Sequence, residues 1–187
     1  MNHLEEIRNF PEHIKIENLK QDDIFSYTGK ASVWGEETAI NINFDDSPAD
    51  ENQKNLPEET FVFLEKYLAW INQHRQEVLQ TLFDDDILSL AEDWASSAEA
   101  YYDEDDEEAD EPEYYIMDDG QKVFLPITEQ DFSKSLHLTA ITFNCPYEEE
   151  EALTEIWCDC SPDYFAYHSI LIYLNGDGSF ENGSLQG

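Results

Sequence analysis

Hydrophobic residues near the N-terminus recur with the period of a half-buried strand. Within residues 24–45, Ile40, Ile42 and Phe44 alternate with Asn41 and Asn43, which places apolar side chains on one face and amides on the other. β-branched and aromatic residues earlier in this stretch favour further strands. We expect turns at the dipeptides 29–30 and 35–36, each of which begins with glycine.

Over residues 57–97 the hydrophobic spacing changes to that of helices. From Phe61 to Leu82 apolar side chains fall three or four positions apart, with Arg75 in the one odd slot. This spacing predicts one amphipathic helix of roughly twenty residues. Pro57 and the two glutamates after it are typical of a helix N-terminus. A second, shorter helix is expected after the three aspartates at 84–86, which can cap it, and it would carry Leu88 and Trp94.

The C-terminal segment 126–187 returns to strand patterns. A short helix capped by Thr128 is expected first, because acidic residues occupy its first turn. Strands follow in "HLTAITFN", "LTEIWCDC" and "HSILIYL", and the last enters a hairpin turn at 175–178. Blocks of strands, helices and strands predict an α+β fold in one domain, 1–187. We expect a mostly antiparallel sheet, with the long amphipathic helix and the second short helix packed on it.

The charge of the chain narrows the class of partner. It carries 44 acidic and 9 basic residues, a net charge of −35, whereas 13% of its residues are aromatic. The aromatic content is that of a folding chain, while the excess acid is far above the charge of about 2–8 that suffices for solubility. A salt-adapted proteome and acidic drift also account for such charge. Direct binding to nucleic acid or an anionic membrane is excluded, since both are polyanions.

The acid is concentrated in one stretch bracketed by tyrosine pairs. Nine of the eleven residues at 103–113 are acidic, and we expect an acidic loop over 99–119 because no lysine or arginine lies there to neutralise it. Acid can steer a basic protein and aromatic rings can anchor it, although the tyrosines can equally pack within the loop. The candidate binding residues are Tyr101, Tyr102, Asp103, Glu104, Asp105, Asp106, Glu107, Glu108, Tyr114 and Tyr115.

Catalytic and metal chemistry find little support in the residue pattern. Cys158 and Cys160 share one face of a predicted strand, but no second ligand pair has the spacing of a zinc site. Cysteine is commonly buried, and this chain offers little positive charge to stabilise a thiolate. His168 is interpreted as a partly buried residue that binds a loop carbonyl. We therefore expect no catalytic residue, no bound metal and no cofactor.

The C-terminal third resembles a family of uncharacterised acidic bacterial proteins. The shared pattern is a short helix led by phenylalanine, two strands, an aspartate–aromatic loop, His-Ser-Ile and a terminal Leu-x-Gly. The N-terminal strands with Trp34 and the helix ending at Trp94 are also similar. The chain departs from the pattern at Tyr167, where glycine is expected, and in its acidic run. The matching positions are Phe132, Leu136, Leu138, Asp163, Phe165, His168, Ser169, Ile170 and Gly187.

Proteins of this kind are frequently immunity proteins of polymorphic toxin systems, including contact-dependent and Maf-type systems. The resemblance therefore implies a protein that binds a basic toxin, such as an RNase of the EndoU type. A small metal-dependent or Cys/His enzyme and a non-specific acidic interaction module are the alternatives, and a homodimer stays open. No apolar signal segment begins the chain, and its cysteines number three, so they cannot all pair in disulfides. We therefore expect a reduced, cytoplasmic protein.

Overall fold

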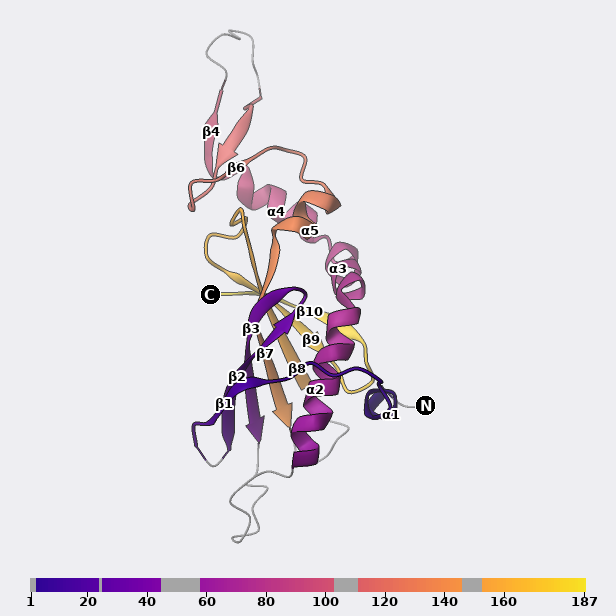
Figure 1. Ribbon diagram of the computed structural model, residues 1–187. Helices are drawn as coiled ribbons and strands as arrows, with labels where there is room; N and C mark the ends of the chain where they lie inside the picture. Colours follow the sequence, from indigo (N-terminus) through magenta and orange to yellow (C-terminus); the bar gives the residue numbers. More distant parts are fainter. Residues whose placement is uncertain (1–2, 24, 45–57, 103–110, 146–152) are drawn as a thin grey trace.

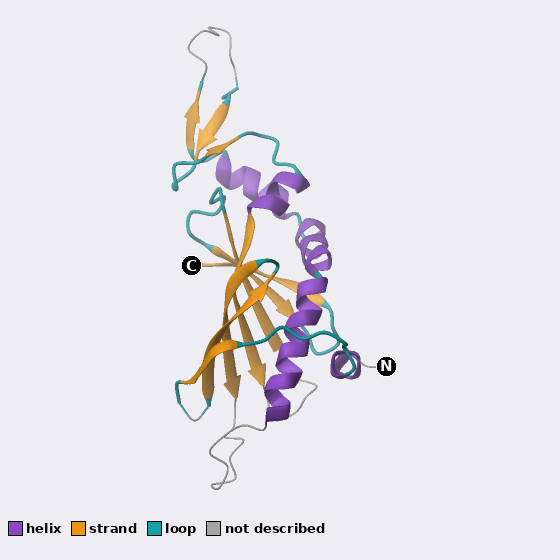
Figure 2. Cartoon of the chain, viewed as in Figure 1, coloured by secondary structure: helices purple, strands orange, loops and turns teal. Residues whose placement is uncertain are grey.

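The computed structural model describes residues 3–23, 25–44, 58–102, 111–145 and 153–187. Within these ranges two sheets lie at different heights of an elongated molecule, with helices between and beside them (Figures 1 and 2). The helices are α1 His3–Arg8, α2 Glu58–Gln73, α3 Arg75–Asp84, α4 Ile87–Ala95 and α5 Glu129–Ser135. The strands are β1 Glu17–Gln21, β2 Ser26–Val33, β3 Glu36–Phe44, β4 Glu99–Tyr101, β5 Tyr114–Ile116, β6 Lys122–Val123, β7 Leu136–Cys145, β8 Leu153–Cys160, β9 Ser169–Leu174 and β10 Phe180–Gln186.

The large sheet has seven strands in the order β1-β2-β3-β7-β8-β9-β10. Its central pair, β3 and β7, is parallel, with Ile40 opposite Ile141 and Ile42 opposite Phe143, and the other neighbours are antiparallel. A parallel pair needs a long crossover, and here the crossover contains α2, α3, α4 and the small sheet. The sheet is therefore mixed, with a parallel pair at its centre, and is not the antiparallel sheet that was expected, while the α+β class holds.

The expected long helix is also wrong, because α2 ends at Gln73 and α3 begins at Arg75. Two carbonyl groups before the break accept hydrogen bonds from side chains. The ring Nδ1 of His74 lies 2.6 Å from the Trp70 oxygen, and the indole of Trp34 donates to the Ile71 oxygen at 3.1 Å. These side-chain bonds compete with the helical pattern and favour a break, so that several short helices replace the predicted one.

The core lies between the helices and one face of the large sheet. Leu64, Leu68 and Ile71 of α2 are buried in the same cluster as Ile42 and Phe143 of the sheet, as their spacing predicts. The opposite face is polar. Its amides form a chain of hydrogen bonds across the strands, from Asn43 to Asn144 at 3.1 Å and from Asn144 to Glu155 at 3.2 Å.

Several local predictions can be compared with the elements directly. The turn at Gly35 is confirmed, since Trp34 and Gly35 both have positive φ between β2 and β3. The turn expected at Gly29 is wrong, because β2 continues through it. Thr128 does cap α5, accepting a hydrogen bond from the Asp131 amide at 3.1 Å. Asp86 precedes α4 but makes no side-chain capping bond.

Candidate protein-binding surface

The region expected to be an acidic loop contains two strands of a separate small sheet. Within 99–119, β4 pairs antiparallel with β5, and β5 pairs with β6 just beyond. The acidic run between them, which includes Asp103, Glu104, Asp105, Asp106, Glu107 and Glu108, lies outside the described residues. The prediction of a loop over the whole stretch is therefore wrong at its two ends, where tyrosine and other β-forming side chains allow strands.

One face of the small sheet carries a row of aromatic rings. Tyr101 lies opposite Tyr114 in the register, and their rings are stacked with centroids 4.6 Å apart and planes at 10°. Phe124 lies on the other side of Tyr114, at 5.7 Å. The ammonium of Lys122 sits 3.8 Å from the Tyr114 centroid, which is a cation–π contact. Tyr114 is consequently only 8% exposed.

The four predicted tyrosines have different positions in this sheet. Tyr101 is 41% exposed and Tyr102 is 50% exposed, so both are accessible to a partner. Tyr114 is buried within the row and supports Tyr101 from behind. Tyr115 is half-buried and lies opposite Ala100 and Val123, on the face directed toward the body. Binding by any of the four stays a prediction, and the exposure favours Tyr101 and Tyr102 as direct contacts.

Hydrogen bonds and apolar contacts hold the small sheet to the large one. The Asp119 carboxylate accepts hydrogen bonds from the Asp163 amide and from the Gln121 side chain, both at 2.9 Å. Gln121 also donates to the Ser161 hydroxyl at 2.8 Å. Met117 and Val123 are buried in the main core cluster. The small sheet is thus fixed to the loop at 161–168, and its aromatic row has a defined position.

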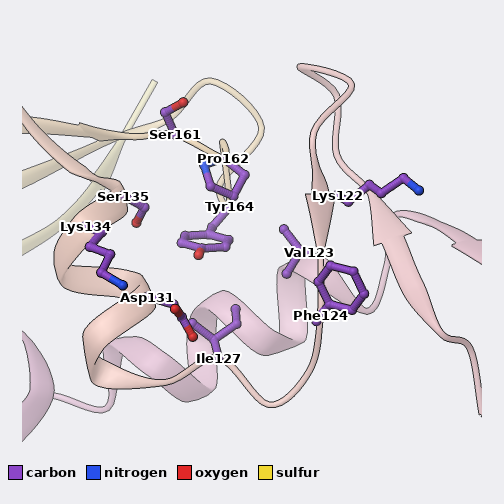
Figure 3. A pocket seen from close by; sticks show the side chains of 10 residues that line it. All are labelled: Lys122, Val123, Phe124, Ile127, Asp131, Lys134, Ser135, Ser161, Pro162 and Tyr164. Atoms are coloured by element: carbon purple, nitrogen blue, oxygen red, sulfur yellow. The ribbon is translucent and has the colours of Figure 1, made fainter.

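A hollow of about 330 Å³ lies where the small sheet meets α5. In Figure 3 the Tyr164 ring projects into it, while Lys122 points away from it. Its wall carries Asp131 and Lys134, charges of opposite sign, and none of its ten described lining residues is a histidine or cysteine. The lining residues are Lys122, Val123, Phe124, Ile127, Asp131, Lys134, Ser135, Ser161, Pro162 and Tyr164.

The cysteine and histidine side chains have structural surroundings. Cys158 and Cys160 both point into the core, as expected for alternate positions of β8. Burial raises the pKa of Cys158 well above its usual value and that of Cys160 to about 12, so their thiolates are disfavoured near neutral pH. In the described part of the chain no three His, Cys, Asp or Glu residues are arranged to hold a metal ion.

The interpretation of His168 is confirmed. Its ring Nδ1 lies 2.8 Å from the Phe165 carbonyl oxygen, and its ring meets Trp94 edge-on with centroids 5.3 Å apart. A Cβ on Gly187 would come within 2.6 Å of this ring, which gives a steric reason for glycine at that position. Asp163 accepts bonds from the amides of Phe165 and Tyr167 and so orders the same turn.

Sequence reasoning missed Phe124 and Lys122 as members of the aromatic surface. Phe124 is 58% exposed, although the segment "KVFL" is typical of a strand that buries alternate side chains. Lys122 is the first basic residue after a stretch of 18 acidic ones at 77–119. The position of this single lysine at the end of the acidic stretch could have indicated its role, because a lone cation there is attracted to the negative charge around it.

Together, the mixed large sheet and the small sheet with its aromatic row define an α+β protein. The chain belongs to a family of uncharacterized proteins conserved in bacteria (DUF2262), whose family model matches residues 15–185. Comparison with curated proteins and with solved structures gave no match. Among the helices of the described residues, none combines the length and apolar character needed to cross a membrane.

Proposed function

We propose that this protein is an immunity protein that binds a basic toxin and neutralises it, and that the toxin is a nuclease. One observation carries the proposal: exposed aromatic rings stand on a small sheet that brackets the most acidic stretch of the chain. Tyr101 and Tyr102 precede the run at 103–113, and Tyr114 and Tyr115 follow it. Among the described residues, the exposed rings and the acidic Glu99 and Glu113 lie with β4 at one end of the molecule (Figure 1).

The charge supports a basic partner through the rate of encounter. Like charges at this density disfavour the compact state, so a partner of opposite charge would relieve repulsion as well as be attracted. Electrostatic steering can raise association from about 10⁵–10⁶ M⁻¹s⁻¹ to 10⁸ M⁻¹s⁻¹ or more at low salt. A nuclease fits this requirement because the surface that binds a polyanionic substrate is itself basic. The same surface would be blocked by the inhibitor.

The exposed rings support a slow dissociation. Tyrosine is enriched among residues that dominate interface energies, and rigid rings lose little conformational entropy on binding. Tyr101 is already held by its stack on Tyr114. The enzyme alternative is less well supported, since the thiols of Cys158 and Cys160 are buried in the core and their pKa values are raised.

The proposal is tested with the product of the gene next to this protein's gene, where the proposal expects a basic toxin module. Purified protein is titrated into an RNA- or DNA-cleavage assay with that domain, and cleavage should stop at one equivalent. Polyglutamate of matched total charge is the control, because a non-specific polyanion should inhibit only in large excess and only at low salt. Inhibition no better than that of polyglutamate, or an adjacent module that is not basic, would refute the proposal.

A further inference from the structure

The small sheet holds a row of two aromatic rings and one cation. Tyr101 and Tyr114 are opposite each other, and Ile116, two residues from Tyr114, is opposite Lys122. Because side chains two apart share a face, Tyr101, Tyr114 and Lys122 lie on one face of the sheet. Their order across it is ring, ring, cation, with separations of 4.6 Å and 3.8 Å.

The chain's own lysine shows what kind of group this surface attracts. The face of a phenol ring is negative and binds cations. The pKa of Lys122 is raised, first by a hydrogen bond with the Tyr114 side chain and further by the charge of Glu113. The row therefore already holds one cation at its β6 end.

Among the residues that the structure describes, the other end of the row is open. Tyr101 lies on β4, an edge strand of the small sheet, and one face of its ring is covered by Tyr114. In the ranges that the structure describes, no ring or cation is recorded against its second face, and the residue is 41% exposed. Glu99 shares this face two residues earlier on the same strand and is exposed. A negative ring face and a carboxylate thus lie side by side at the free edge.

We propose that the free face of Tyr101 receives an arginine side chain of the basic partner, with Glu99 accepting its N–H donors. The proposal rests on the function proposed above and names its anchoring contact. Arginine is favoured over lysine because its planar guanidinium stacks on a ring and matches a carboxylate in two places. The bound state is then a four-membered row, cation–ring–ring–cation, with Lys122 at one end and the partner's arginine at the other.

The support of Tyr101 by Tyr114 explains why this ring suits the role. A ring already stacked at 4.6 Å is held in place before the partner arrives, so little further entropy is lost on binding. Tyr102 is more exposed, at 50%, but no described ring is recorded against it. It therefore serves as the matched control, because both tyrosines belong to the same segment and replacing either leaves the net charge unchanged.

The test uses a tri-arginine amide peptide as the probe and its citrulline analogue as the uncharged control. Affinities are measured by NMR titration for the whole protein and its Tyr101 variants. Cation–π contacts at exposed sites are worth about 0.5–1 kcal/mol, which is about 2–5-fold in affinity. Tyr101→Leu should weaken tri-arginine binding by that factor, Tyr101→Phe should change it less than twofold, and Tyr101→Trp should strengthen it. Tyr102→Leu should weaken it less than Tyr101→Leu does, because the recorded stack on Tyr114 supports Tyr101 and not Tyr102. The citrulline peptide should not distinguish the variants.

Equal affinity for the parent protein and Tyr101→Leu would overturn the inference, as would an equal loss in Tyr102→Leu. The Tyr101→Trp variant keeps the test valid if Tyr101→Leu disturbs the small sheet, because a gain in affinity cannot come from unfolding. The two proposals also fail separately. If Tyr101→Leu neutralises the toxin as well as the parent protein does, only the arginine contact is refuted. If tri-arginine binding depends on Tyr101 but the protein does not neutralise the toxin, only the proposed function is refuted.

Discussion

The two sheets of this protein are stabilised in different ways. The large sheet has strands of five to ten residues and buries one face under α2 and α3. The small sheet has strands of two or three residues, too few to be stable in water without other contacts. It depends on its aromatic row, on Met117 and Val123 in the shared core, and on the bonds of Asp119. The large sheet thus supplies most of the stability, and the small sheet presents exposed aromatic rings at the surface.

Removing a core ring should have the largest effect on stability. Phe143 is 2% exposed and packs against Tyr67 with ring centroids 5.6 Å apart, so Phe143→Ala should lower the free energy of unfolding by about 3–5 kcal/mol. Urea denaturation followed by circular dichroism measures the loss. The matched control is Val62→Ala on the exposed side of α2, which should change stability by less than about 0.5 kcal/mol. A loss below about 1 kcal/mol for Phe143→Ala would contradict the assignment of the core.

Removing a ring from the small sheet should have a local effect. Tyr114→Leu removes the ring that stacks on Tyr101 and that the Lys122 ammonium contacts. An aromatic pair of this kind is worth about 0.5–1.5 kcal/mol. Amide hydrogen exchange at 114–116 should therefore accelerate up to about tenfold, while exchange in β9 stays unchanged. Equal acceleration in both sheets would show that they open as one unit, and the contrast between them would then be wrong.

A smaller effect is expected from pH at the N-terminal helix. His3 of α1 is 7% exposed and its ring meets Trp70 at 4.6 Å. Its pKa is lowered, first by burial, against smaller raising effects of Glu6 and Asp177. The folded state therefore binds fewer protons than the unfolded state, so this contribution to stability is complete above about pH 6.5 and declines as pH falls toward the folded pKa. The decline, followed by thermal unfolding between pH 7.5 and 5, should diminish in His3→Gln, and an identical pH profile would contradict it.

The sequence predicted elements better than their arrangement. The period-2 pattern around Ile40 and the 3–4 spacing from Phe61 to Leu82 report which face of an element is buried, and the structure buries those faces. Strand order is not encoded locally, since β3 and β7 pair across about a hundred residues. The break at His74 depends on the Trp34 indole reaching the Ile71 carbonyl from β2–β3. Such a tertiary hydrogen bond leaves no periodic signal.

The candidate surface was foreseen in composition and missed in geometry. Acid and tyrosine at 101–115 are visible in the sequence, but the pairing of β4 with β5 divides the tyrosines into exposed and supporting ones. Propensity alone favoured a loop because the repulsion of the acid run dominates the window. Lys122 and Phe124 join the row only after the chain turns at Gly120, whose φ of 78° is readily adopted by glycine.

The central claim is that acid steers a basic partner and exposed rings retain it, and the kinetics of binding to the adjacent toxin domain test it most directly. Rates are measured by surface-based kinetics at 0.05, 0.15 and 0.5 M salt, as the Debye length falls below about 10 Å. Changing Asp103, Glu104, Asp105 and Asp106 to their amides should slow association and flatten its salt dependence, with little change in dissociation.

Tyr101→Ala should do the reverse and raise the dissociation rate by about tenfold, about 1.4 kcal/mol. The charge-matched control converts four exposed acids elsewhere to their amides: Glu17, Asp22, Glu58 and Glu181. The account predicts a smaller loss of association rate for the control than for the acidic run. Association that is insensitive to salt, or that slows equally in both amide variants, would contradict it.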